Sequence, residues 1–217
     1  MSETETTAAA YSQPREWLLW TAATAGGWLL GSLFSILLSI VLSMTGLDAA
    51  FRADQAEASQ SLALLSMALW LGFYLITGLC VGAMQWLVLR RHLAGLQRWA
   101  IFTGLGFALG TFAFPAFMGA GVGLMQWLLL RRDLSKTGWW PVMNAVVWPL
   151  GYMVGGSLGV TVGAAVNSAL LASLLSAALA GVIIGAVTGA VLLWLLRENA
   201  ALLESLRQDK EAEQAKR

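Results

Sequence analysis

The hydrophobic pattern of this chain consists of long apolar stretches separated by short polar segments. Four stretches contain no Asp, Glu, Lys, Arg or His, and they cover residues 17–47, 61–89, 99–130 and 139–196. Each exceeds the about 20 apolar residues that a membrane-spanning helix needs. The pattern therefore predicts an all-α, polytopic membrane protein with one membrane domain over residues 15–197.

Basic residues beside the apolar stretches predict the orientation of the chain. Arg and Lys mark the cytoplasmic side of a membrane protein. Placing Arg15 on that side puts the polar loop 48–60 outside and the pair Arg90-Arg91 inside. Stretches 99–130 and 139–196 then begin and end next to cytoplasmic charge, so each must cross an even number of times. We therefore expect six transmembrane helices with both termini in the cytoplasm.

The third apolar stretch is too long for one spanning helix and short for two. We expect a tight hairpin broken near Pro115, with two helices of about 16 residues that fall just short of a full span. A re-entrant hairpin is the alternative. The turn in the fourth stretch is predicted near residues 163–168. At the chain ends, residues 1–14 are predicted to be a disordered cytoplasmic tail, and residues 198–217 a cytoplasmic helical tail.

A ten-residue element that ends in arginine occurs twice, 41 positions apart. The two copies run from Gly82 to Arg91 and from Gly123 to Arg132. We align a degenerate third copy with Gly189–Arg197, in which Leu192-Leu193 stands where the others have Gln-Trp. Each copy is an apolar helix end that runs into arginine.

A second element, which begins with tryptophan, precedes each copy of the first. It starts at Trp20, Trp99 and Trp140, and a Thr or Asn follows four residues later. The repeating unit is therefore a two-helix hairpin, and three units fill the chain. Their approximate ranges are 17–91, 99–132 and 139–197. Since each unit crosses twice, the three hairpins are parallel repeats, and we expect a six-helix bundle with approximate threefold symmetry.

Glycines spaced four residues apart indicate close helix packing. Small residues at this spacing let the backbones of two membrane helices approach each other. Two ladders are predicted to serve this role, namely Gly151, Gly155, Gly159 and Gly163 on one helix and Gly181, Gly185 and Gly189 on the next. Some of these faces could instead serve self-association or bind the helices of a partner.

Five polar residues occupy equivalent positions of the repeats, close to the predicted cytoplasmic interface. They are Gln85, Gln126, Thr24, Thr103 and Asn144. One interpretation is hydrogen bonding between helices, worth about 0.6 kcal/mol per contact on average. The other is a ligand-binding layer that lines a pocket open to the cytoplasmic leaflet.

Tryptophans and arginines gather at the same predicted interface. Eleven tryptophans are present, and those near the helix ends, Trp20, Trp99 and Trp140 among them, are expected to form an aromatic belt at headgroup level. Stacking on a flat ligand is the alternative. Four arginines are topology signals or sites for anionic lipid headgroups, namely Arg90, Arg91, Arg131 and Arg132.

The composition also excludes several classes of function. The apolar stretches contain no ionisable residue of the kind that proton-coupled pumps and voltage sensors need. One Cys and one His allow neither an intrachain disulfide nor a zinc or haem site built by this chain alone. No nucleophile–base pair is visible. We therefore expect no enzyme, no metal, no cofactor and no nucleic-acid partner.

The repeated element resembles a known group of proteins. Gly-x3-Gly-x-Met-Gln-Trp-Leu-x-Leu-Arg-Arg at 78–91 and 119–132, with the Trp/Thr/Gly element at 20–31, is similar to repeats in a loose group of uncharacterised bacterial multi-pass membrane proteins. The resemblance covers most of 17–197 and implies a location in the bacterial inner membrane, but it implies no activity.

Two hypotheses about function follow. The first is a non-enzymatic membrane subunit, a scaffold or accessory protein, whose partners are the lipid bilayer and either other integral membrane proteins or further copies of itself. The second is a small-solute or lipid-binding transport component. Size, six crossings and cytoplasmic ends resemble the substrate-binding membrane subunits of energy-coupling-factor vitamin importers, an analogy of shape alone.

Overall fold

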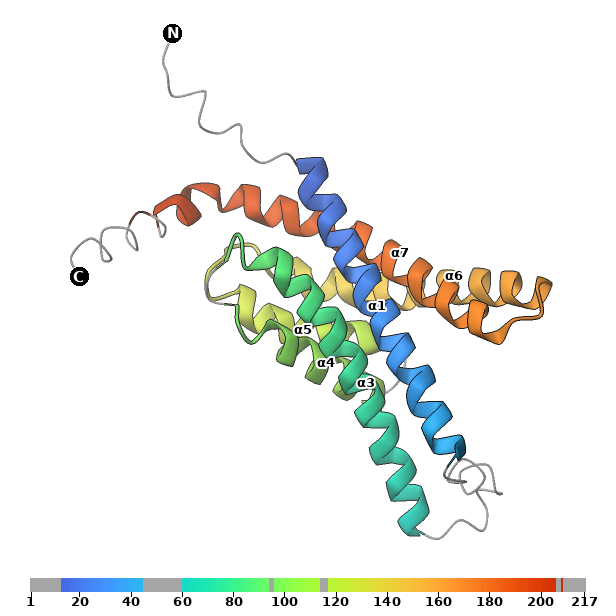
Figure 1. Cartoon of the computed structure of the whole chain (residues 1–217). Helices are drawn as coiled ribbons and strands as arrows, with labels where there is room; N and C mark the ends of the chain where they lie inside the picture. Colours follow the sequence, from blue (N-terminus) through green and yellow to red (C-terminus); the bar gives the residue numbers. More distant parts are fainter. Residues whose placement is uncertain (1–12, 45–59, 94–95, 114–116, 206–207, 209–217) are drawn as a thin grey trace.

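The computed structural model describes residues 13–44, 60–93, 96–113, 117–205 and 208. This part of the chain contains α-helices and no strand, so the predicted all-α class is confirmed (Figure 1). The helices are α1 (Gln13–Met44), α3 (Gln60–Leu89), α4 (Trp99–Ala113), α5 (Met118–Leu130), α6 (Trp139–Ala165) and α7 (Ala169–Glu198). Residues 1–12, most of the predicted N-terminal tail, lie outside the described residues.

Four of the described helices are long and apolar enough to cross a membrane. The spans are Pro14–Met44, Met67–Leu89, Trp139–Ala165 and Ala169–Glu198. The remaining two, α4 and α5, are apolar but have 15 and 13 residues. At about 1.5 Å per residue they are shorter than a hydrocarbon core of about 30 Å. The long apolar helices indicate insertion into a lipid bilayer.

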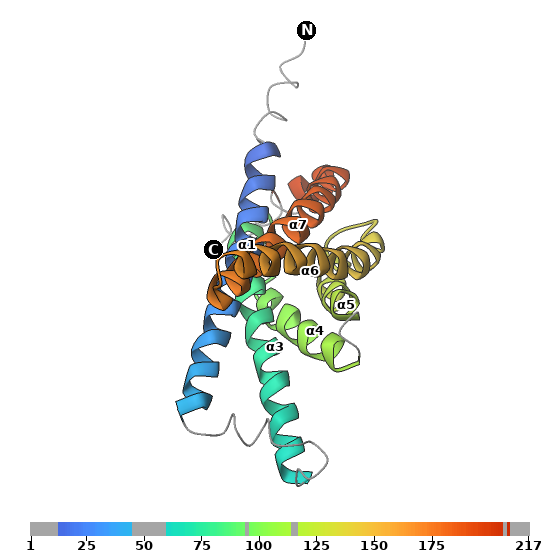
Figure 2. The ribbon, with the colours of Figure 1, turned by 90° about the vertical axis from the view of Figure 1, so that its right-hand side faces the viewer.

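The six helices form a closed ring. Each helix packs against the next one in the chain, and α7 packs back against α1. Beyond this ring, the long helices continue as two pairs, α1 with α3 and α6 with α7, which diverge from each other (Figures 1 and 2). The short helices α4 and α5 do not extend in this way, so the ring is complete only at the end of the molecule that carries the arginines.

The turns inside the two later apolar stretches lie where the sequence predicts them. Helix α4 ends at Ala113 and α5 begins at Met118; Pro115 itself lies outside the described residues. The turn between α6 and α7 uses Asn167 in the left-handed conformation, with φ of 51°. Ser168 then caps α7, because its side chain accepts a hydrogen bond of 3.2 Å from the Leu171 N–H.

The predicted C-terminal tail begins as a helix. Helix α7 ends at Glu198, Asn199 forms a turn, and residues 200–205 are again helical. The loop that precedes α6 is tied to this region, because Asn199 Oδ1 accepts hydrogen bonds of 2.8 Å from both the N–H and the hydroxyl of Ser135.

Candidate functional site: the aromatic and polar core of the ring

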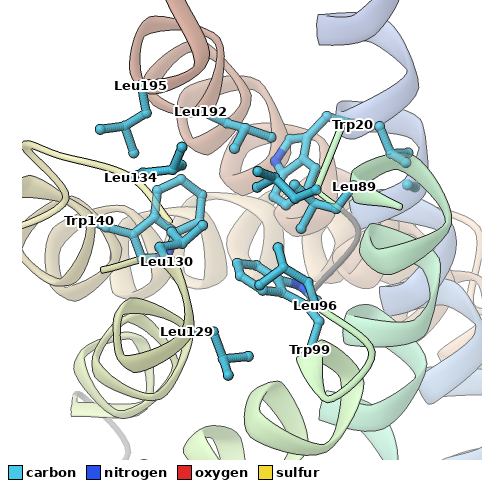
Figure 3. Close-up of a cluster of buried hydrophobic side chains, with 13 residues drawn as sticks. Trp20, Leu89, Leu96, Trp99, Leu129, Leu130, Leu134, Trp140, Leu192 and Leu195 are labelled. Atoms are coloured by element: carbon cyan, nitrogen blue, oxygen red, sulfur yellow. The ribbon is translucent and has the colours of Figure 1, made fainter. Parts of the chain in front are cut away.

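Three tryptophans from three different helices meet at the centre of the ring. Trp20 of α1, Trp99 of α4 and Trp140 of α6 have pairwise ring-centroid distances of 6.2–6.3 Å and edge-to-face geometry. Aromatic pairs prefer this geometry because the positive edge of one ring meets the negative face of the other. Figure 3 shows the three indoles pointing toward one another between the helices. We call this cluster the tryptophan triangle.

The tryptophan triangle corrects one prediction. Trp20, Trp99 and Trp140 are at most 1% exposed, so the expectation that they belong to an aromatic belt is wrong. The prediction placed them by depth along the helix, and a position near a helix end can face either the lipid or the axis of the ring. All three are the first residue of the tryptophan element in the sequence, and in the ring their indoles face one another.

A second aromatic triangle lies eight residues further along the same helices. Trp28, Phe107 and Trp148 have pairwise ring-centroid distances of 5.2–5.7 Å. Eight residues correspond to roughly two helical turns. Val81, Val122 and Ile184, whose side chains are completely buried, pack in one core cluster with this second triangle. On the other side of the tryptophan triangle, leucines cover it, among them Leu89, Leu130 and Leu192 (Figure 3).

The predicted polar residues form a layer at the level of the tryptophan triangle, and all five are buried, none more than 2% exposed. Gln85 is at the centre of one half of this layer. Its amide nitrogen donates to Thr24 Oγ1 over 3.2 Å. Its oxygen accepts from the indole N–H of Trp99 and from the amide of Gln126, both over 3.2 Å.

Gln126 extends the layer to the next hairpin. Its amide nitrogen also donates to Thr103 Oγ1 over 2.9 Å, and its oxygen accepts from the indole N–H of Trp140 over 3.0 Å. One connected hydrogen-bond network thus crosses α1, α3, α4 and α5, and its members are Thr24, Gln85, Thr103 and Gln126. Asn144 lies at the equivalent position of α6, but its hydrogen bonds go to the Trp140 carbonyl and to the indole N–H of Trp148.

A sixth member of the polar layer, Thr188, was missed by the sequence analysis. Its hydroxyl accepts a hydrogen bond of 2.9 Å from the indole N–H of Trp20 and donates to the Ile184 carbonyl. Thr188 therefore accepts the hydrogen bond of the Trp20 indole. Gln85 and Gln126 accept the corresponding hydrogen bonds of Trp99 and Trp140.

Glycine contacts confirm that the third copy must be shifted by one helical turn. A Cβ atom at Gly82 would lie 2.7 Å from Thr103 Cβ, and one at Gly123 would lie 2.7 Å from Asn144 Cβ. The glycine that faces the corresponding Thr24 is Gly185, at 2.9 Å. The alignment with Gly189–Arg197 is therefore wrong. Gly181-x3-Gly185, which matches Gly78-x3-Gly82 and Gly119-x3-Gly123, was the signal for the correct register.

The two predicted glycine ladders pack against different neighbours. The ladder of α6 faces α7, where Gly155 contacts Ala180, Gly159 contacts Ser176 and Gly163 contacts Ala172, while Gly151 contacts Ile184. The ladder of α7 faces α1, where Gly181 contacts Ala25, Gly185 contacts Thr21 and Gly189 contacts Trp20. At five of these glycines a Cβ atom would overlap backbone atoms of the neighbouring helix, so a larger residue would push the two helices apart, whereas at Gly151 and Gly189 it would meet the side chains of Ile184 and Trp20.

The four predicted headgroup arginines, Arg90, Arg91, Arg131 and Arg132, are all exposed. Two of them lie over the tryptophan four residues earlier. The guanidinium carbon of Arg90 is 5.3 Å from the ring centroid of Trp86, and that of Arg131 is 4.7 Å from Trp127. These are cation–π distances. Lipid binding by the arginines remains a prediction.

The core of the ring offers packing and hydrogen bonding. Every polar side chain of the layer has a hydrogen-bond partner. Among the buried side-chain atoms of the described residues, Trp28 Nε1 has none. The described residues also hold no cluster of metal-binding side chains. A binding role for the five predicted residues remains a prediction, and a pocket of about 530 Å³ lies elsewhere, beside Lys136 and Trp194.

Comparison with known proteins gives no further assignment. No protein-family model, no curated protein and no solved structure matches this chain.

Proposed function

We propose that this chain is a non-enzymatic scaffold or accessory subunit of a larger assembly in the bacterial inner membrane. The observation that carries the proposal is the polar layer, in which Gln85 and Gln126 are buried and bonded to residues of neighbouring helices. Such bonds fix which helices pair and in which register. Both glutamines have their hydrogen-bond partners within this chain, so the polar layer holds the six helices rigidly together.

The proposed arrangement in the membrane is six spans, built from three parallel hairpins with both termini cytoplasmic. Equivalent contacts support it, because the tryptophan triangle takes one residue from the first helix of each hairpin. In this arrangement the short pair α4 and α5 spans a locally thin bilayer or stops within it. Hydrophobic mismatch of this kind is tolerated at modest cost.

The surface that a partner would contact lies on the diverging helix pairs. The outer part of α1 exposes a row of large apolar side chains that includes Leu33, Leu37 and Val41, and α6 exposes Tyr152 and Met153. In a membrane these side chains contact either lipid tails or the helices of another subunit. Because α4 and α5 are short, a neighbouring helix can approach the outer ends of α3 and α6 without meeting them.

Purification from the native membrane with gentle solubilisation, followed by native mass spectrometry, tests the proposal. We expect the chain to travel with other integral membrane subunits or with further copies of itself. A variant with Gln85→Leu and Gln126→Leu that still folds should keep those companions, because the polar layer does not contact them. A chain that appears alone with one stoichiometric solute would contradict the scaffold and favour the transport component. Loss of that solute in the double variant would then place it at the polar layer.

A further inference from the structure

A pocket opens at the end of the molecule that carries the arginines, between the start of α6 and the end of α7. It is lined by Lys136, Gly138, Trp139, Val142 and Trp194, and its volume is about 530 Å³. Its walls are mainly apolar, and Lys136 is the one charged residue that lines it. Both tryptophans are exposed. We call it the Lys136 pocket.

The backbone of Lys136 has an unusual conformation. Its φ is 59°, in the left-handed region that favours glycine. The loop Arg131–Trp140 has the same length as Arg90–Trp99, and in that earlier loop the corresponding residue is Gly95. A lysine that replaces glycine at such a position carries backbone strain, and strained positions occur preferentially at functional sites.

Hydrogen bonds tie the strained lysine to the end of α7. Ser135 donates twice to Asn199 Oδ1, and the Asn199 amide donates back to the Ser135 carbonyl over 3.3 Å. Asn199 itself is buried and also donates to the Leu195 carbonyl. Immediately after Ser135, the ammonium of Lys136 forms an ion pair with Glu198. The loop is therefore held in place, and with it the ammonium at the mouth of the pocket.

The sequence differs here from the second hairpin in a specific way. In the register set by Gly123 and Gly185, Trp194 takes the position of Arg132. In the alignment of Trp99 with Trp140, Trp139 takes the position of Arg98. Compared with the second hairpin and the loop before it, the third hairpin and the loop before it have tryptophans in place of two arginines and a lysine in place of a glycine. The result is one cation, paired with the Glu198 carboxylate, beside two aromatic walls. This combination suits an amphiphile whose single anionic head takes the place of that carboxylate.

We propose that the Lys136 pocket binds one anionic phospholipid of the surrounding bilayer. The phosphate pairs with the Lys136 ammonium in competition with Glu198, and the glycerol and the upper acyl chain lie against Trp139 and Trp194. Tryptophan prefers this headgroup depth, and lysine near a membrane surface attracts anionic lipids. A free phosphate ion would gain nothing from the apolar walls. The site is separate from the surfaces that the scaffold would use to contact partners.

Native mass spectrometry of the detergent-solubilised full chain tests this site. Phosphatidylglycerol or phosphatidylcholine is added, and the lipid-bound fraction is measured. We expect wild type to retain one phosphatidylglycerol at a lower concentration than phosphatidylcholine. Lys136→Gly removes the charge and relieves the strained backbone, and we expect it to weaken phosphatidylglycerol binding about fivefold while the chain stays folded. Glu198→Gln removes the competing carboxylate and should strengthen the same binding.

A matched pair of tryptophan variants separates the pocket from general lipid contact. Trp139 and Trp70 are 61% and 59% exposed, and Trp70 lies on α3. Trp139→Ala should weaken retention of phosphatidylglycerol, and Trp70→Ala should leave it unchanged. Equal retention by wild type and Lys136→Gly would overturn the proposal. So would occupancy by inorganic phosphate alone at the same affinity, which would make the site an anion site without a lipid.

Discussion

The inner and outer parts of the long helices carry similar apolar sequence and bury it very differently. Within the ring, Trp20 of α1 and Trp140 of α6 are almost fully buried. Beyond the ring, residues of α1 such as Leu37 and Met44 are exposed. Lipid tails are as apolar as leucine, so hydrophobicity alone does not decide which faces pair. The difference lies in glycines that allow close approach and in polar groups that need partners, and these determine the ring.

The largest effect is expected where a side chain would enter a closely packed helix crossing. Gly119→Ala places a Cβ atom against the backbone carbonyl of Asn144. The helices α5 and α6 must move apart, so we expect a loss of unfolding free energy of about 1–3 kcal/mol or more. Unfolding in mixed detergent micelles with increasing SDS measures it.

Gly156→Ala is the control for that substitution, because Gly156 has no heavy atom within 4 Å of the added Cβ. This glycine lies in the outer part of α6, inside a helix, where alanine is favoured by up to about 1 kcal/mol. We expect unchanged or slightly increased stability. Equal losses in the two variants would mean that close approach at Gly119 does not hold the ring together.

A smaller effect is expected from removing one buried acceptor. Thr188→Val keeps the shape of the side chain but leaves the indole N–H of Trp20 without its acceptor, and an unsatisfied buried donor costs about 1–3 kcal/mol. Thr161→Val is the matched control. Its hydroxyl also donates to the carbonyl four residues earlier, but it is exposed, so its loss should leave stability nearly unchanged. A larger loss of stability in Thr161→Val than in Thr188→Val would contradict this prediction.

The smallest effect compares two tryptophans of the second aromatic triangle. The Trp148 indole donates to Asn144 over 2.7 Å, whereas the Trp28 indole has no partner. The cause is local, since Thr24 stands where α6 has Asn144. Trp148→Phe should therefore cost about 1 kcal/mol for a lost hydrogen bond. Trp28→Phe loses no hydrogen bond and should cost less. Thermal unfolding of both variants in one detergent checks the order, which a greater loss for Trp28→Phe would contradict.

Much of the architecture could be predicted from the sequence. Apolar length and charge placement predicted the helices to within a few residues, as at the α6–α7 turn beside Asn167. The repeat also predicted that Gln85 and Gln126 occupy equivalent places. These features are local or periodic, so they can be read along the chain.

The remaining features depend on which way each helix face points. Depth along a helix does not separate Trp20, which is buried on the axis, from Trp139, which is exposed. Thr188 was missed because the third copy was aligned on its arginine, and arginine marks the membrane boundary while glycine marks the helix contact. The Lys136 pocket depends on a backbone angle and on a loop bound to Asn199, and neither appears as a motif.

The closure of the ring between α7 and α1 has a consequence for how the chain can be divided. Gly185 meets α1 as Gly82 meets α4 and Gly123 meets α6. No loop connects α7 to α1, whereas loops connect α3 to α4 and α5 to α6. The α7–α1 contact nevertheless packs a glycine against the neighbouring helix in the same way as the other two. Covalent connection between neighbouring hairpins is therefore not what makes them pair. The gene could be opened at the loop before α4 or before α6, and the hairpins supplied as separate polypeptides or in a circularly permuted order, with the same core.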